Sequence, residues 1–253
     1  MSFSLPVRIL AVLATALAVI YVAYVAIIGF NQRSFLYFPS HRTADTPLAA
    51  WIVRGKLIGY SRVVDHPRTI WLMTHGNGGQ ADGRAYVLNH LARTDSLYVL
   101  EYPGYGLRSG QPSKTAINQA AAEAYVILRT ENPSTPIGVI GESIGSGPAS
   151  FLATLPHPPD KVVLIVPFDN LASVAGEHMP LLPVRLILQD DWDNLAALQA
   201  YAGPVDIYGA VFDEVIGFAH AKNLAAHLKH ARFVEIPGGH NDWSESVLVR
   251  IER

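Results

Sequence analysis

The chain has 253 residues, 50% of them apolar, with a formal net charge of −2 and no cysteine. This length and composition are typical of one α/β unit with a substantial core. The near-neutral charge, without a basic block or interleaved aromatic residues, argues against nucleic acid as a partner. The absence of cysteine from the sequence excludes disulfides, thiol nucleophiles and cysteine-ligated metal sites.

An apolar stretch at residues 9–30 carries no charge over 22 positions. A helix that spans the hydrocarbon core of a bilayer needs roughly 20 such residues. The alternative is a cleaved signal peptide, whose apolar region has about 7–15 residues and ends at a small-x-small site, which residues 27–31 do not offer. We therefore expect residues 1–30 to be an uncleaved transmembrane anchor and residues 31–253 to form the domain that follows it.

The charges beside the anchor are nearly balanced, with Arg8 and the α-amine before it and Arg33 and Arg42 after it. The positive-inside rule therefore gives almost equal weight to both orientations. A short N-terminal tail before a single anchor is compatible with the tail inside and the domain outside. We expect a single-pass membrane protein with an extracytoplasmic domain.

After a connector at residues 31–50, strands and helices alternate. Early strands, expected to be antiparallel, lie at residues 51–53 and 57–64. Further strands are expected at residues 69–74, 96–101, 137–140, 161–166, 205–208 and 232–236. Helices are expected at residues 81–94, 113–129, with Ser113 as the cap, and 219–230, and one follows residue 145. This alternation predicts a mostly parallel, doubly wound sheet.

Residues 170–200 break this rhythm and are expected to form a lid-like insertion above the sheet. Their apolar runs at 179–184 and 186–188 fit a helix packed on the core. The alternative is that these runs line an acyl pocket or touch the bilayer.

The chemistry centres on residues 141–147, Gly-Glu-Ser-Ile-Gly-Ser-Gly, between a short apolar strand and a helix of small residues. The pattern Gly-x-Ser-x-Gly forms a tight strand-to-helix turn with the serine at its apex. Side chains at Gly141 or Gly145 would collide with the neighbouring strand and helix, and the turn holds Ser143 in a strained conformation. We expect Ser143 to be a nucleophile.

A serine nucleophile needs a base, because its free hydroxyl is weakly nucleophilic at neutral pH. His240 directly follows the last predicted strand in a Gly-Gly-His segment, and an imidazole has an ordinary pKa of about 6.5. Asp213, in the loop after the strand at 205–208, is the candidate acid that orients the imidazole. Asp169, after the preceding strand, is the alternative acid. The order Ser143, Asp213, His240 is that of α/β-hydrolases.

Two backbone N–H groups are expected to form an oxyanion hole. One belongs to Ile144, directly after the candidate nucleophile, and the other comes from the glycine-rich loop at 75–79, His-Gly-Asn-Gly-Gly. Asn77 is the expected donor in that loop, with Gly78 as the next candidate. Each such donor stabilises the transition state by about 3–4 kcal/mol.

The ordered motifs are the loop at 75–79, Tyr-Pro-Gly-Tyr-Gly-Leu-Arg-Ser-Gly-Gln-Pro at 102–112, the Ser143 motif, Asp213-Glu214 and Gly239-His240-Asn241. Together they resemble the Bem46-like α/β-hydrolases, over about residues 30–245. The resemblance implies an α/β-hydrolase fold and serine hydrolase activity. It also implies an N-terminal membrane anchor, which several members carry.

We therefore expect a serine hydrolase that cleaves a small-molecule or lipid-like ester or thioester through an acyl-enzyme. The histidines show no metal-ligand spacing, and the chemistry needs no metal or organic cofactor. A peptidase or amidase of the same fold is one alternative. A catalytically silent, membrane-tethered binding module is the other. The identity of the substrate and the oligomeric state are open at this point.

Overall fold

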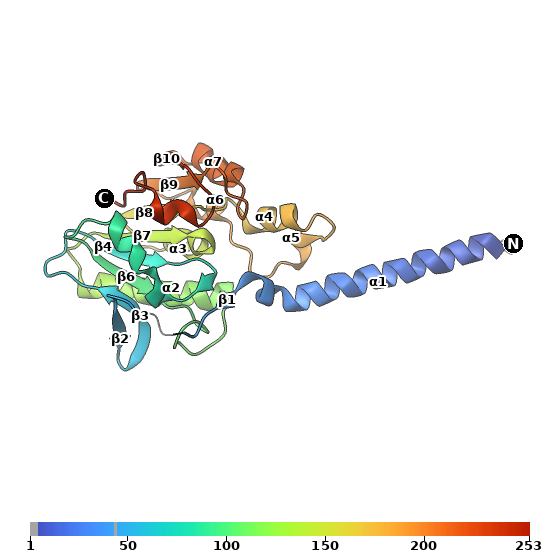
Figure 1. The fold of residues 1–253 in the computed structure, drawn as a ribbon, viewed down its shortest axis with the longest axis horizontal. Helices are drawn as coiled ribbons and strands as arrows, with labels where there is room; N and C mark the ends of the chain where they lie inside the picture. Colours follow the sequence, from blue (N-terminus) through green and yellow to red (C-terminus); the bar gives the residue numbers. More distant parts are fainter. Residues whose placement is uncertain (1–4, 43–44) are drawn as a thin grey trace.

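Helix α1 (Leu5–Leu36) extends away from the rest of the chain as a long rod (Figure 1). The computed structural model describes residues 5–42 and 45–253, so residues 1–4 of the predicted anchor lie outside the described residues. Among the described residues, α1 is the one helix long and apolar enough to cross a membrane. Its 32 residues measure about 48 Å at 1.5 Å per residue, which exceeds the thickness of a hydrocarbon core.

The helix continues through residues that we predicted as a connector. Polar side chains after Phe30 bond back to the helix, with Asn31 Nδ2 donating to Ile27 O at 2.8 Å and Gln32 Nε2 donating to Gly29 O at 2.6 Å. These residues are compatible with a helix, and they contact the lid, as described below. Irregular chain therefore begins only after residue 36.

Within the described residues, eight strands form the main sheet, in the order β10-β9-β8-β7-β4-β6-β3-β2 (Figure 1). The β2–β3 and β3–β6 pairs are antiparallel, and the remaining neighbours are parallel. The strands are β2 (Ala49–Val53), β3 (Lys56–Arg62), β4 (Ile70–Thr74), β6 (Ser96–Leu100), β7 (Ile137–Glu142), β8 (Lys161–Ile165), β9 (Val205–Ala210) and β10 (Ala231–Ile236). The predicted mostly parallel sheet with early antiparallel strands is confirmed.

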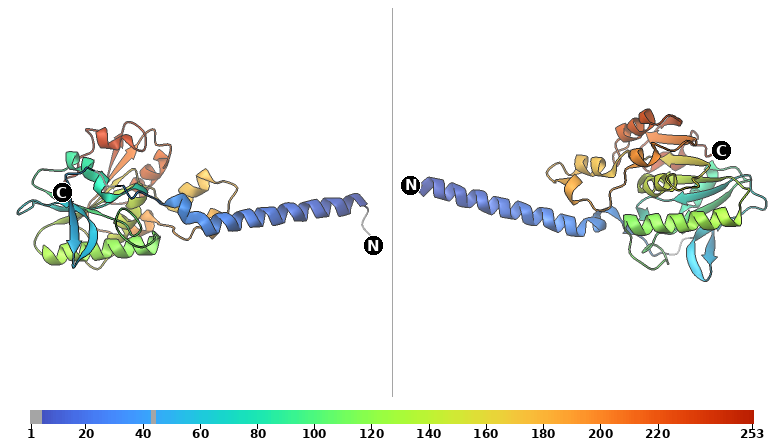
Figure 2. Two further views of the ribbon diagram at one scale, coloured as in Figure 1. Left: turned by 60° about the horizontal axis from the view of Figure 1, so that its bottom comes forward. Right: turned by 180° about the vertical axis from the view of Figure 1, so that it is seen from behind.

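Both faces of the sheet are covered, because side chains along each strand alternate between two cores. In β4, Ile70 and Leu72 belong to the core under the α-helices, whereas Trp71 and Met73 belong to the opposite core. The first core contains residues of α2 (Lys114–Glu131), α3 (Ser146–Leu152), α6 (Asn194–Leu198) and α7 (Phe218–His227). The second contains residues of the 3-10 helices η1 (Ala81–His90) and η3 (Asp242–Glu245) and of the C-terminal segment. Figure 2 shows α2 lying along one face.

Two helix predictions can be compared in detail. Ser113 caps α2 as predicted, since its Oγ accepts from Ala116 N at 3.1 Å. The helix predicted at residues 81–94 is instead a 3-10 helix that ends at His90. Arg84 has non-helical backbone angles there, φ −99° and ψ 18°, so a regular α-helix cannot pass through it.

The insertion at residues 170–200 contains α4 (Leu171–His178), α5 (Val184–Ile187) and α6. We call residues 171–190, with α4 and α5, the lid. The lid lies beside the last turns of α1 in both figures (Figures 1 and 2). A small apolar cluster of lid residues packs against Val25 and Ile28 of α1.

A buried ion-pair network ties the last three strands together. Asp206 of β9 contacts Lys161 Nζ of β8 at 2.8 Å and Arg232 of β10 at 2.9 Å. Burial works to raise the pKa of Asp206, but hydrogen bonds from the two cations outweigh it and hold this pKa below its usual range. The network fixes the part of the sheet whose loops carry the predicted acid and histidine.

Candidate active site

Ser143 stands at the apex of the turn between β7 and α3. Its φ of 54° is a left-handed conformation, which is strained for a serine. A Cβ at Gly141 would lie 2.6 Å from Ser146 Cα, and one at Gly145 would lie 2.1 Å from Thr74 O. Only glycine fits at both positions, so the turn packs closely on β4 and holds the serine above the sheet.

His240 lies next to Ser143, although 97 residues separate them in sequence. Its Nε2 is 2.9 Å from Ser143 Oγ, and its Nδ1 is 2.8 Å from Asp213 Oδ2. The histidine follows β10 through Gly238, whose φ of 96° gives the chain the turn it needs. An ionised carboxylate only accepts hydrogen bonds, so the proton of a neutral imidazole lies on Nδ1 and Nε2 faces the serine as an acceptor.

The carboxylate of Asp213 is fixed by its own loop. Oδ1 accepts from the N–H of Val215 at 2.9 Å and of Ile216 at 2.8 Å. This leaves Oδ2 for His240. The three predicted catalytic residues are therefore brought together in one hydrogen-bonded series.

The alternative acid, Asp169, belongs to a different network. Its Oδ1 is 2.7 Å from Nδ1 of His220, and Asn223 donates to its other oxygen. Burial works to raise the pKa of Asp169, but hydrogen bonds from Asn223 and His220 hold it below its usual range. The geometry thus joins His240 to Asp213 rather than to Asp169.

The loop that carries Asn77 is braced by tyrosines from the next strand's loop. Tyr105 Oη donates to Asn77 O, and Tyr102 Oη donates to His75 O, each at 2.7 Å. The short strands β1 (Phe38–Pro39) and β5 (Gly78–Gly79) pair beside it, which attaches the chain after α1 to this loop. His75, Tyr102 and Tyr105 are buried, and these bonds hold the loop in place.

Asn77 and Ile144 line the same cavity as Ser143. Among the described residues, none accepts a hydrogen bond from the Asn77 N–H, whereas the Asn77 carbonyl accepts two. Ile144 lies in the first turn of a helical segment, where N–H groups have no intrahelical acceptor. Both predicted donors are therefore beside the serine, with N–H groups available to a ligand.

Glu142 links the turn that carries Ser143 to the loop that carries Asn77. Its carboxylate accepts from Gly76 N at 3.2 Å, from Tyr86 Oη at 3.0 Å and from Trp243 Nε1 at 3.1 Å. Arg84 lies 3.5 Å away and balances its charge. These partners come from three separate elements, so the sequence holds no local signal for them.

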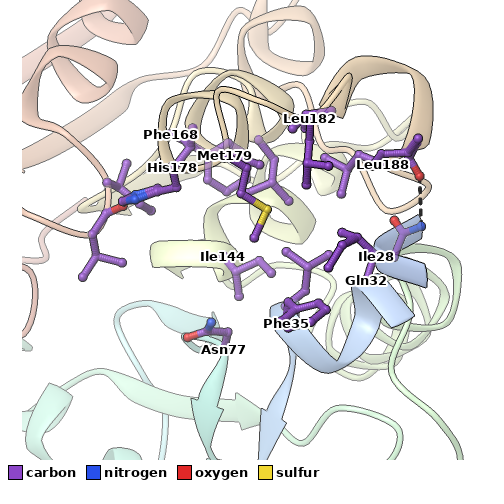
Figure 3. Close-up of a pocket in the computed structure, with 18 of the residues that line it drawn as sticks. Ile28, Gln32, Phe35, Asn77, Ile144, Phe168, His178, Met179, Leu182 and Leu188 are labelled. Carbon is purple, nitrogen blue, oxygen red and sulfur yellow. Dashed lines mark hydrogen bonds between the residues drawn. The ribbon is translucent and has the colours of Figure 1, made fainter. Parts of the chain in front are cut away.

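A cavity of about 300 Å³ opens beside Ser143 and is lined almost wholly by apolar side chains. Figure 3 shows Met179, Leu182 and Leu188 of the lid facing Ile28 and Phe35 of α1 across it. Of the two readings of the lid's apolar runs, lining a pocket is therefore the one that these contacts support. Sequence reasoning missed the contribution of α1, because an apolar helix end looks the same whether it meets lipid or a pocket.

Within residues 5–42 and 45–253, no group of three or more His, Cys, Asp or Glu side chains is arranged to hold a metal ion. The prediction that no metal or cofactor takes part stays a prediction.

No protein-family model matches the chain. An uncharacterized protein of Mycobacterium tuberculosis is 29% identical over 86% of this chain and 83% of its own length. The alpha/beta hydrolase domain-containing protein 17C of Xenopus tropicalis is 31% identical over 75% of this chain, and the lysophosphatidylserine lipase ABHD12 of Danio rerio is 27% identical over 63%. The chain spans 62% and 46% of these two relatives, less than two thirds of either.

Among solved structures, an esterase of Pyrococcus furiosus has a TM-score of 0.62 at 13% identity, covering 83% of this chain and 94% of its own. At this identity the likeness concerns the fold alone. The fold and the named relatives together place the chain in the α/β-hydrolase superfamily.

Proposed function

We propose that the chain is a membrane-anchored serine hydrolase that cleaves carboxylic esters or thioesters through an acyl-enzyme. The observation that carries this proposal is the series of contacts from Asp213 through His240 to Ser143, at 2.8 and 2.9 Å. A lipase among the relatives and an esterase among the similar folds support the same type of bond. We also infer, from the ordered motifs, a Bem46-like member of the superfamily.

In the first half-reaction, Ser143 Oγ attacks the carbonyl carbon of the substrate while its proton passes to Nε2 of His240. Asp213 accepts from Nδ1 and stabilises the imidazolium that forms. The carbonyl oxygen takes up the negative charge, and the N–H groups of Asn77 and Ile144 donate to it. The strained turn already holds Ser143 in place, so little reorganisation precedes attack.

The tetrahedral intermediate then collapses, and His240 gives its proton to the leaving alcohol or thiol. The acyl group remains on Ser143 as an ester. Water attacks this ester while His240 takes one of its protons, and the acid leaves as Ser143 regains its hydrogen. The scheme needs no metal or organic cofactor.

We propose that residues 1–30 anchor the hydrolase domain, residues 31–253, with residues 170–200 as its lid-like insertion. Large apolar side chains of α1, among them Leu13, Leu17 and Ile20, are more than half exposed to solvent in the isolated chain. A surface of this kind is stable when lipid covers it. The expected extracytoplasmic orientation is tested by protease protection in sealed vesicles, with tags at both ends of the chain.

The substrate that fits best is an ester with an apolar acyl group, small or lipid-like, because the lining of the cavity beside Ser143 is apolar. A fluorophosphonate probe is expected to label the full-length protein and to leave Ser143→Ala unlabelled. Labelling that survives in Ser143→Ala would overturn the proposal. A panel of esters, thioesters and aminoacyl amides separates the esterase from the amidase alternative, since faster amide cleavage would favour the latter.

A further inference from the structure

One face of the last turns of α1 lies against the lid. Val25, Ile28, Gly29 and Gln32 are spaced at three, one and three residues, which puts them on one side of a helix. Val25 and Ile28 pack on the lid's apolar cluster, and a Cβ at Gly29 would lie 3.7 Å from Ile187 Cβ, an ordinary contact distance. This end of the helix is therefore packed against protein, unlike the exposed turns before it.

Gln32 fastens this face to the lid. It is the one buried residue among those described in α1. Its Nε2 donates to Ile187 O at 2.9 Å (Figure 3). Its Oε1 accepts from Gln189 N at 2.6 Å. A single amide thus bonds the backbone on both sides of Leu188.

Three further contacts hold the lid against α1 and the residue that follows it. Arg33 Nε lies 2.9 Å from Asp190 Oδ2, and that oxygen also accepts from Tyr37 Oη at 3.1 Å. Burial, followed by the nearby Asp190 carboxylate, raises the pKa of Tyr37, so its hydroxyl remains a donor. Nearer the N-terminus, Tyr21 Oη donates to Leu181 O at 2.9 Å. Tyr21 and Gln32 are 11 positions apart, so the lid follows α1 for about 16 Å.

The same face of α1 closes the cavity beside Ser143. Ile28 and Phe35 line it, opposite Leu182 and Ile187 of the lid. Leu182 is next to Leu181, whose backbone carbonyl accepts the hydrogen bond from Tyr21 of α1. The lid therefore reaches from the cavity beside the candidate nucleophile to the segment proposed to lie in the bilayer.

We propose that the last turns of α1 are a substrate-binding element as well as a tether. Ile28 and Phe35 form one wall of the acyl pocket, and Gln32 positions this wall against the lid. The helix end thereby sets the acyl-chain length that the site accepts. The inference rests on the proposed function, because the acyl group is that of the ester that Ser143 cleaves.

The test compares two neighbouring substitutions in the full-length protein in detergent micelles. Ile28→Trp puts an indole into the cavity of about 300 Å³. Ile27→Trp, the matched control, changes the same residue type at a position that is 61% exposed and outside the cavity. The assay measures kcat/KM for p-nitrophenyl acetate and p-nitrophenyl laurate, and fluorophosphonate labelling reports whether the site is folded.

For Ile28→Trp we expect kcat/KM for laurate to fall about tenfold or more, because each methylene kept out of the pocket costs roughly a factor of four. The acetate value should change less than about threefold, and Ile27→Trp should match the wild type. We call the ratio of kcat/KM for laurate to that for acetate the length profile. The inference is overturned if Ile28→Trp and Ile27→Trp have the same length profile, or if Ile28→Trp loses equally on both esters. If Ile28→Trp is not labelled, the smaller change Ile28→Phe is measured instead. An unchanged length profile in Ile28→Phe also overturns the inference. A wild-type protein that neither cleaves acetate nor becomes labelled overturns the proposed function itself, a result distinct from an unchanged length profile.

Discussion

Replacing Asp213 by asparagine tests the proposed roles of the acid and the histidine together. In the wild type, Oδ1 accepts two backbone N–H groups and Oδ2 faces His240 Nδ1. Asparagine has only one acceptor oxygen, and the two N–H donors of the loop will claim it. Its NH2 group then points at Nδ1, which must accept, so the imidazole proton moves to Nε2. A protonated Nε2 cannot take the proton of Ser143.

The expected loss of kcat depends on which of its two orientations the new amide would adopt in the Asp213→Asn variant. Turning the oxygen towards His240 would place NH2 against the N–H groups of Val215 and Ile216, and each lost bond costs about 1 kcal/mol or more. The unreactive orientation is thus favoured by about 2 kcal/mol, and the variant also lacks the negative charge that stabilises the imidazolium. Loss of the acid by this change lowers kcat by about 10⁴-fold in Ser-His-Asp triads. That factor corresponds to about 5.4 kcal/mol.

The assay is ester hydrolysis and the rate of fluorophosphonate labelling, with thermal unfolding to check the fold. Asp169→Asn is the matched control, since it removes the same charge from the alternative acid, which pairs with His220. We expect it to retain activity within about tenfold of the wild type, because it lies outside the Ser143 series. Asp213→Asn that keeps more than about a tenth of the wild-type kcat, or Asp169→Asn that loses as much as Asp213→Asn, would refute the assignment.

Three further predictions concern the turn, the sheet and the lid. Gly145→Ala should lower the free energy of unfolding by about 3 kcal/mol and abolish fluorophosphonate labelling, because the new Cβ would lie 2.1 Å from Thr74 O. Gly83→Ala is the control and should leave labelling intact, since no packing neighbour among the described residues lies within 4 Å of a Cβ at that position. Asp206→Asn should lower the free energy of unfolding by about 3 kcal/mol near neutral pH, measured by chemical denaturation at a series of pH values. The pKa of Asp206 is lower in the folded chain, so its stabilising charge is fully present above the unfolded pKa of about 3.9 and is lost as the pH falls further. The difference in free energy of unfolding between the wild type and Asp206→Asn should therefore shrink below about pH 4. A difference that persists there contradicts the prediction. Gln32→Ala should lower kcat/KM for laurate by about thirtyfold, because two hydrogen bonds of about 1 kcal/mol each amount to about 2 kcal/mol. Acetate hydrolysis should change much less, and an equal effect on both esters would argue for a purely structural role.

The order of the elements and the parallel sheet could be predicted because their signals are local. Buried strands such as β8 are continuous apolar runs, and the strand-to-helix turn at Ser143 needs glycines at fixed positions. Chain order then assigns the acid and the histidine, since parallel strands bring their carboxyl ends to one edge of the sheet. Asp213 and His240 lie in those loops and meet Ser143 as the order suggests.

Helix geometry over residues 81–90 was harder to predict, because tertiary contacts outweigh the local pattern there. Arg84 departs from helical angles where its guanidinium reaches Glu142 and the carbonyl of Gly78. Such contacts join residues 58 and 6 positions apart and leave no periodic trace in the sequence. The same holds for Glu142, whose partners come from η1, η3 and the loop after β4.

The contacts made by the end of α1 were also impossible to predict from the sequence. An apolar helix read from sequence predicts a membrane span, and Ile27 and Ile28 are equivalent in that reading. Only the packed structure distinguishes them, since one is exposed and the other lines the cavity beside Ser143. Gln32 is the residue that could have raised the question, because a lone amide beside an apolar stretch needs polar partners when it is removed from water. Those partners are backbone groups 155 and 157 positions away in the lid, so the amide indicates a neighbour but not which one. An anchor that ends in a buried amide is therefore better read as a helix that meets its own domain than as a simple tether.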